Sequence, residues 1–157
     1  MNDVIQTILH RRSIRRFEDK QIEEKTLDAI LQAGLYAPSA GGRQGVIFAV
    51  CQDKIINERL GRIKRANSNP RMARKGNYIS KDQPSITDDP KLTNAFYHAP
   101  TVITLFAPKH FLFAVDDCAV AAENMMLAAD SLGVGSCYIG QGWTAFEDPY
   151  GQEILQK

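Results

Sequence analysis

Long apolar runs and cysteine-rich patterns are both absent from this sequence. No stretch reaches the roughly 18–20 apolar residues of a transmembrane helix, and the N-terminal residues lack the apolar core of a secretion signal. The three cysteines, Cys51, Cys118 and Cys137, are too widely spaced to predict a disulfide framework or a metal site. A net charge of +1 argues against strong attraction to nucleic acid or membranes. These absences predict a soluble, cytoplasmic protein.

The length and composition of the chain suit one packed domain. The chain has 157 residues, of which 44% are hydrophobic, so we expect a single domain over residues 1–157. Apolar spacing predicts four helices and three strands that do not alternate regularly, which favours the α+β class. The expected helices are 4–12, 27–35, 56–63 and 113–132; the expected strands are 46–50, 101–107 and a short one within 133–140.

The expected helix 113–132 is apolar on more than one face. Such a helix is buried in a core or an interface, and a chain of this size has little material to cover it on all sides. The acidic residues within it, Asp116 and Asp117 among them, exclude a membrane span. We therefore expect a homodimer with this helix at the interface.

The first candidate motif is RRSIRRF, which spans residues 11–17. Clustered guanidinium groups form charge-assisted bonds to a phosphate, and Ser13 adds a hydroxyl donor. The alternative is a basic helix end, where solvated cations interact favourably with the helix dipole.

The second motif is APSAGGRQ, residues 37–44. Pro38 ends a helix, two glycines allow a flat ligand to approach the backbone, and Gln44 offers a donor and an acceptor to the edge of a heterocycle. The alternative is an ordinary loop between a helix and a strand.

The third motif is GVGSCYIG, residues 133–140. It matches neither a P-loop nor a dinucleotide fingerprint. One interpretation is that its backbone amides face the ring of a bound ligand. The alternative is a helix cap followed by a core strand. We assign no catalytic side chain: Cys137 lacks an activating neighbour, and His10, His98 and His110 show no metal spacing.

The polar segment 66–94 predicts an extended loop. Its basic residues Arg71, Arg74 and Lys75 are candidates for a lid or for a contact to a ligand phosphate, or they belong to a solvated loop.

Taken in order, the three motifs resemble the nitroreductase family of flavoproteins. RRSIRRF is similar to the family's Arg-Arg-Ser-x-Arg signature, and APSAGGRQ to its Ala-Pro-Ser-x-x-Asn-x-Gln segment. DDCAVAAENMMLAADSLGVGSCYIG is similar to the family's central helix and following strand. The resemblance covers nearly the whole chain. It departs at Gly42, where the family often has Asn, and at the C-terminus, where the family's last strand and arm are lacking.

The resemblance implies a nitroreductase-like fold, a mixed and mostly antiparallel sheet flanked by helices, and a homodimer that binds FMN at its interface. It also implies a ping-pong cycle in which NAD(P)H reduces the flavin at N5 and a nitroaromatic, quinone or similar acceptor reoxidises it. The implied cofactor-binding residues are Arg11, Arg12, Ser13 and Arg15 at the phosphate and ribityl chain; Pro38, Ser39 and Ala40 from the partner subunit; Gln44 at the pyrimidine edge; and Tyr138, Ile139 and Gly140 over the ring.

Two other classes remain open from sequence alone: a flavin carrier or sensor without turnover, and a cofactor-free structural α+β dimer.

Overall fold

The computed structural model describes residues 2–68 and 81–156, and the chain divides into two compact units. The first unit comprises residues 1–13, 21–50 and 103–138. The second unit comprises residues 14–20, 51–102 and 139–157. Each unit is therefore assembled from segments that are far apart in the sequence.

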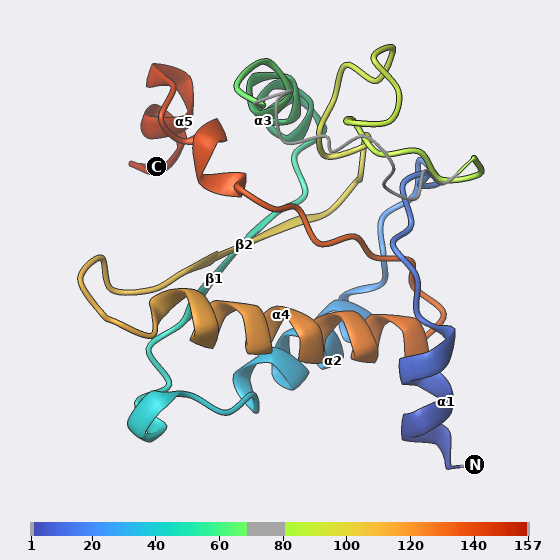
Figure 1. Cartoon of the computed structure of the whole chain (residues 1–157), viewed down its shortest axis with the longest axis vertical. Helices are drawn as coiled ribbons and strands as arrows, with labels where there is room; N and C mark the ends of the chain where they lie inside the picture. Colours follow the sequence, from blue (N-terminus) through green and yellow to red (C-terminus); the bar gives the residue numbers. More distant parts are fainter. Residues whose placement is uncertain (1, 69–80, 157) are drawn as a thin grey trace. The chain divides into compact units, whose positions relative to one another are not determined.

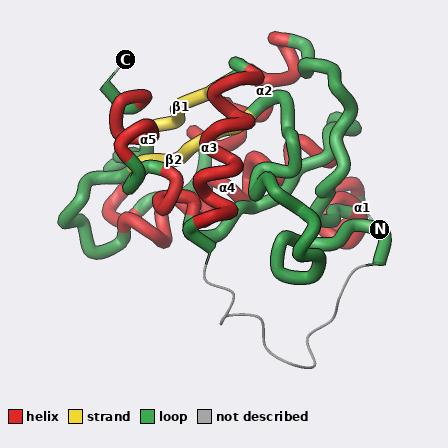
Figure 2. The backbone as a smooth tube through the Cα atoms, turned by 90° about the horizontal axis from the view of Figure 1, so that it is seen from above, coloured by secondary structure: helices red, strands yellow, loops and turns green. Residues whose placement is uncertain are grey.

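The first unit contains three helices and most of a small sheet (Figure 1). Strands β1 (Ile47–Cys51) and β2 (Val102–Phe106) pair in a two-stranded antiparallel sheet, seen side by side in Figure 2. The helices are α1 (Asp3–His10), α2 (Glu24–Leu35) and α4 (Ala114–Ser131), and a 3-10 turn, η1, covers Ala40–Gly42.

The core of the first unit lies between α2 and α4. Ile30 of α2 packs with Met125 and Ala129 of α4, and Phe48 of β1 packs against them. A Cβ atom at Gly34 would lie 2.8 Å from Met125 Cγ and 2.9 Å from Phe48 Cζ. Because those contacts are too short, only glycine lets α2 lie this close to α4 and β1.

Helix α1 packs beside the end of α4, where His10 Nδ1 lies 2.9 Å from Asp130 Oδ2. Its N-terminus is capped by Asn2, whose side chain accepts a hydrogen bond from the amide of Ile5. No residue of α1 is buried. The apolar stripe of this helix is therefore not covered by the residues that the structure describes.

The second unit is built around α3 (Lys54–Ala66). Its core joins Leu60 to Phe96 and to Ala145, which lies in the 3-10 turn η3 (Gly142–Ala145). A last helix, α5 (Pro149–Ile154), contributes Tyr150, whose ring centroid lies 3.7 Å from Arg59 Cζ of α3.

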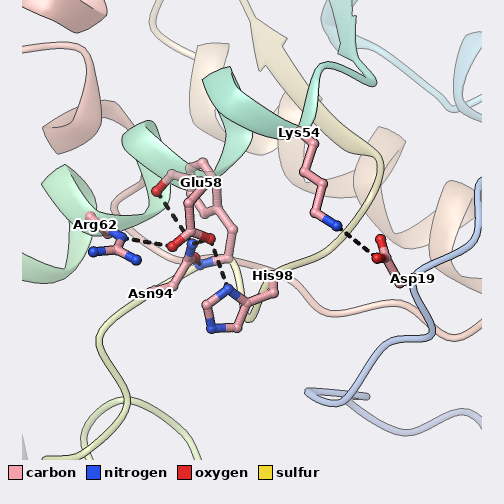
Figure 3. A network of polar contacts seen from close by, with 7 residues as sticks. Asp19, Lys54, Glu58, Arg62, Asn94 and His98 are labelled. Carbon is pink, nitrogen blue, oxygen red and sulfur yellow. Dashed lines mark hydrogen bonds and ion pairs between the residues drawn. The ribbon is translucent and has the colours of Figure 1, made fainter.

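A polar network around Glu58 ties α3 to the segment before β2 (Figure 3). The Glu58 carboxylate accepts hydrogen bonds from Arg62 Nε at 2.6 Å and from the buried Asn94 Nδ2 at 2.8 Å, and His98 Nδ1 lies 2.7 Å away. Partial burial alone would raise the pKa of Glu58. The hydrogen bonds from Arg62 and His98, the charge of His98 and the bond from Asn94 outweigh it, so the pKa is lowered from its ordinary value of 4.5.

The expected helices and the first two strands are confirmed, with ends that differ by a few residues. The expected strand within 133–140 is wrong: only an isolated bridge at Ser136 forms there. Gly133 has φ 74°, and in the backbone that follows only Ser136 pairs with another segment. A single paired residue is too little for a β-ladder. The pattern also missed η3 and α5, which are too short to show a helical stripe.

Two further observations concern the rest of the chain. Within the loop expected at 66–94, residues 81–94 form turns and bends. Arg71, Arg74 and Lys75 lie outside the described residues. Among the helices that the structure describes, none is both long and apolar enough to cross a membrane.

The Glu58 network predicts how stability depends on pH. Because the folded pKa of Glu58 is lowered, its contribution is fully present above the unfolded value and is lost as pH falls through the folded pKa. We expect Glu58→Gln to lower the free energy of unfolding by about 1–3 kcal/mol near neutral pH. The loss of stability on acidification should also become shallower.

Urea unfolding from about pH 7 to about pH 3 measures both effects. Glu18→Gln, at an exposed position of the same unit, is the control and should behave like the wild type. An acid-dependence of Glu58→Gln that matches the wild type would contradict the assignment.

Candidate functional site

Two of the three sequence motifs meet in the first unit. Ser13, which follows α1, forms an isolated parallel bridge with Ser136, which follows α4. The Ser136 Oγ atom is buried and has no hydrogen-bond partner among the residues that the structure describes. A buried hydroxyl without a partner is uncommon in folded proteins. It marks the junction of these segments as a candidate ligand site.

The two arginines before Ser13 have different surroundings. Arg12 Nη1 donates to the carbonyl oxygens of Leu9 at 2.8 Å and Arg11 at 2.7 Å, so it satisfies the end of α1. For Arg12, this is the helix-end contact that the sequence left open as an alternative. The Arg11 guanidinium and the Ser13 hydroxyl form no hydrogen bond within the described parts of the chain. Both are therefore free to bind an anion.

Arg15 lies in the second unit, where neighbouring groups hold it. Its Nη1 atom donates to the Gln83 carbonyl oxygen at 2.7 Å, and its Cζ atom lies 5.9 Å from the centroid of the Tyr97 ring. Its Nε atom is buried and lacks a partner among the described residues. One donor of this guanidinium thus remains unsatisfied.

The second motif forms an ordered turn after α2. The Ser39 hydroxyl accepts from the Gln44 amide at 2.9 Å, and Gln44 Nε2 donates to the Ala37 carbonyl at 3.2 Å. Gly41 and Gly42 both have φ 65°, a conformation in which glycine is favoured. Pro38 is exposed at the surface of this turn.

A residue to which the sequence analysis assigned no site role holds this turn. Asp117 of α4 is only 5% exposed, and its Oδ1 atom accepts from the Ala40 amide at 2.9 Å. It also lines a small pocket with Ala37, Pro38 and Gln44. The signal was in the sequence: Asp117 lies four and eight residues before the buried Ala121 and Met125, on the inward stripe of the helix.

The third motif contributes mainly backbone. Tyr138 is 53% exposed, whereas the Ile139 side chain packs into the core of the second unit. A Cβ atom at Gly140 would meet nothing within 4 Å, so open space lies beside this backbone. The Ile139 side chain is thus partly occupied by core packing, and its main chain remains available to a ligand.

The three cysteines form no disulfide within the described residues. Burial, followed by the charge of Asp117, raises the pKa of Cys118 and makes this thiol a weaker nucleophile. In the described residues, no group of three or more His, Cys, Asp or Glu side chains is arranged to hold a metal ion.

The donor set fits a cofactor that carries a phosphate and a flat polar ring. Arg11 and Ser13 supply a cation and a hydroxyl for the phosphate. The turn at 37–44 supplies polar groups that suit the edge of a ring.

Comparison with known proteins identifies the same family over most of the chain. The Nitroreductase family profile matches residues 8–145. A nitroreductase from Bacteroides fragilis, solved with bound FMN, superposes with a TM-score of 0.78 at 34% identity over 99% of this chain and 79% of that one.

Two curated proteins with related names are also similar to this chain. A protein from Archaeoglobus fulgidus, whose name places it among NADH dehydrogenases or NAD(P)H nitroreductases, is 32% identical over 140 residues, 89% of this chain and 68% of its own length. An NADPH-flavin oxidoreductase from Vibrio harveyi is 33% identical over 141 residues, again 89% of this chain but 54% of its own length. The chain thus spans about half to two thirds of these relatives. With the motifs, the α+β fold and the family profile in agreement, this chain belongs to the nitroreductase family.

Proposed function

We propose that this chain binds FMN and acts as an NAD(P)H-dependent flavin oxidoreductase that reduces nitroaromatic, quinone or similar acceptors. The observation that carries the proposal is the pairing of Ser13 with Ser136, which brings the phosphate motif beside the motif expected over the flavin ring. Similarity to an FMN-bound nitroreductase over 99% of the chain supports the cofactor. The name of the Vibrio harveyi relative supports the use of reduced nicotinamide.

The chain's own residues hold and orient the cofactor. Arg11 and Ser13 bind the phosphate, with charge-assisted bonds that contribute about 1.5–3 kcal/mol each. Arg12 supports this segment by capping α1, and Arg15 of the same motif is a further candidate ligand. The partner subunit's Pro38, Ser39 and Ala40 lie against the ring, and Gln44 lies near its pyrimidine edge. Tyr138, Ile139 and Gly140 pass over one face of the ring.

Bound FMN supplies the electron-transfer chemistry, accepting electrons from reduced nicotinamide and passing them to the acceptor. The protein excludes competing reactions and keeps one face of the ring open. No side chain is required as a nucleophile.

The active form is a homodimer that buries the uncovered apolar stripe of α1. Val4 and Leu9 in this stripe are 64% and 57% exposed, and Ile5 and Ile8 lie beside them. An exposed apolar stripe of this kind is typical of a surface that a protein partner covers.

The cofactor and the turnover are tested on the purified protein. We expect a yellow protein with the absorbance of bound flavin, which bleaches when NADH or NADPH is added without oxygen. A nitroarene or quinone should then restore the absorbance. Failure to retain added FMN would contradict the proposal, and bleaching without recovery would leave a carrier or sensor.

The phosphate assignment is tested by Arg11→Ala combined with Ser13→Ala. We expect FMN affinity to fall at least tenfold, because losing two donors costs about 1.5–3 kcal/mol or more. FMN fluorescence titration of the apoprotein measures the change. Arg16→Ala, an exposed arginine of the same motif, removes the same charge and should leave affinity unchanged. Equal affinity in the double variant and the wild type would refute the assignment.

The dimer is tested by Val4→Asp combined with Leu9→Asp. Two charges on the α1 stripe should convert a dimer into a monomer while the unit stays folded, since both side chains are largely exposed in the single chain. Analytical ultracentrifugation reports the mass, and circular dichroism reports the fold. Gln6→Asp, at an exposed polar position of α1, should remain dimeric. A monomeric wild type would disprove this part of the proposal.

A further inference from the structure

The adjacent residues Asp116 and Asp117 at the start of α4 have different surroundings. Asp116 is exposed, whereas Asp117 is 5% exposed and its Oδ1 atom accepts from the Ala40 amide at 2.9 Å. Both lie in the first turn of the helix, so the helix dipole favours both charges equally. The two residues therefore differ in burial and in the bond to Ala40.

Ala40 occupies the middle of the turn between α2 and β1. The turn closes on itself through bonds from Gly42 to Ser39 and from Gln44 to Ser39 and Ala37. Those bonds define its shape but not its position. The bond from Ala40 to Asp117 connects the turn to α4, which is packed into the core.

Burying a carboxylate is costly unless it is hydrogen-bonded. Asp117 has one side-chain bond to the turn and otherwise lines a small pocket of about 20 Å³, room for one water molecule, together with Pro38 and Ser39. An alanine or valine here would pack without that cost. The position of the carboxylate under the turn thus points to a role in holding the turn rather than in general stability.

We propose that Asp117 is a positioning residue for the flavin: it fixes the 37–44 turn at the place where the turn contacts the ring. This inference rests on the proposed binding of FMN. Asp117 acts through the Ala40 amide and does not itself contact the cofactor.

The first test is FMN affinity. We expect Asp117→Ala to weaken FMN binding about tenfold, which corresponds to about 1.4 kcal/mol. Asp117→Asn, which keeps an acceptor oxygen of the same shape, should restore most of the affinity. Asp116→Ala is the matched control, because it removes the same charge from the same helix turn, and it should bind FMN like the wild type.

The second test needs no cofactor. Hydrogen exchange of the Ala40 amide in the apoprotein should be at least about tenfold faster in Asp117→Ala than in the wild type or in Asp117→Asn. Exchange of the Met125 amide in the middle of α4 should be unchanged. A residue that only stabilised the fold would accelerate both amides together, and that result would overturn the proposal.

The two tests separate the possible failures. If the wild type does not bind FMN, the proposed function fails, and the exchange data alone decide whether Asp117 holds the turn. If the wild type binds FMN and Asp117→Ala binds it equally, the positioning role is refuted. If Asp117→Ala does not fold, Asp117→Val, which fills the space without an acceptor, takes its place with the same expected tenfold loss.

Discussion

The close packing of α2 against α4 positions the candidate site in the first unit. Gly34 allows this packing, because any side chain there would overlap Met125 and Phe48. With α2 fixed, its C-terminal end delivers the 37–44 turn to the buried carboxylate of Asp117. The other end of α4 leads to Ser136, which pairs with Ser13. The packing of α2 against α4 thus determines the positions of the 37–44 turn and of Ser136.

Buried polar groups in this structure differ in whether they have hydrogen-bond partners. Around Glu58, each polar atom has neighbours that compensate its burial, and the carboxylate stays charged because three donors surround it. Ser136 Oγ of the first unit, by contrast, is buried without a partner among the described residues, as are Arg15 Nε and Asn57 Oδ1 of the second unit. A buried polar atom without a partner calls for an explanation such as a ligand. The Ser136 hydroxyl lies beside Ser13, where the sequence predicts a phosphate.

The structure refines what the family motifs imply. The Arg-Arg-Ser signature reads as three equivalent phosphate ligands, but Arg12 already donates to carbonyl groups at the end of α1. Ile139 faces the core, so the third motif acts through its backbone and through its exposed neighbours Tyr138 and Gly140. A motif therefore names the segment that meets a ligand, while the local contacts decide which atoms remain available to it.

The sequence by itself determined the helices with a clear apolar period, the two apolar strands and the α+β class, because these depend on the spacing of neighbouring side chains. It also determined the family, since three motifs occur in a characteristic order. Only the tertiary structure decided that the segment after α4 pairs at one residue instead of forming a strand, that the Asp117 carboxylate accepts a hydrogen bond from the Ala40 amide, and that Arg15 donates to the Gln83 carbonyl oxygen. These features depend on contacts between residues as far apart as Ser13 and Ser136, and local spacing carries no information about which distant groups will meet.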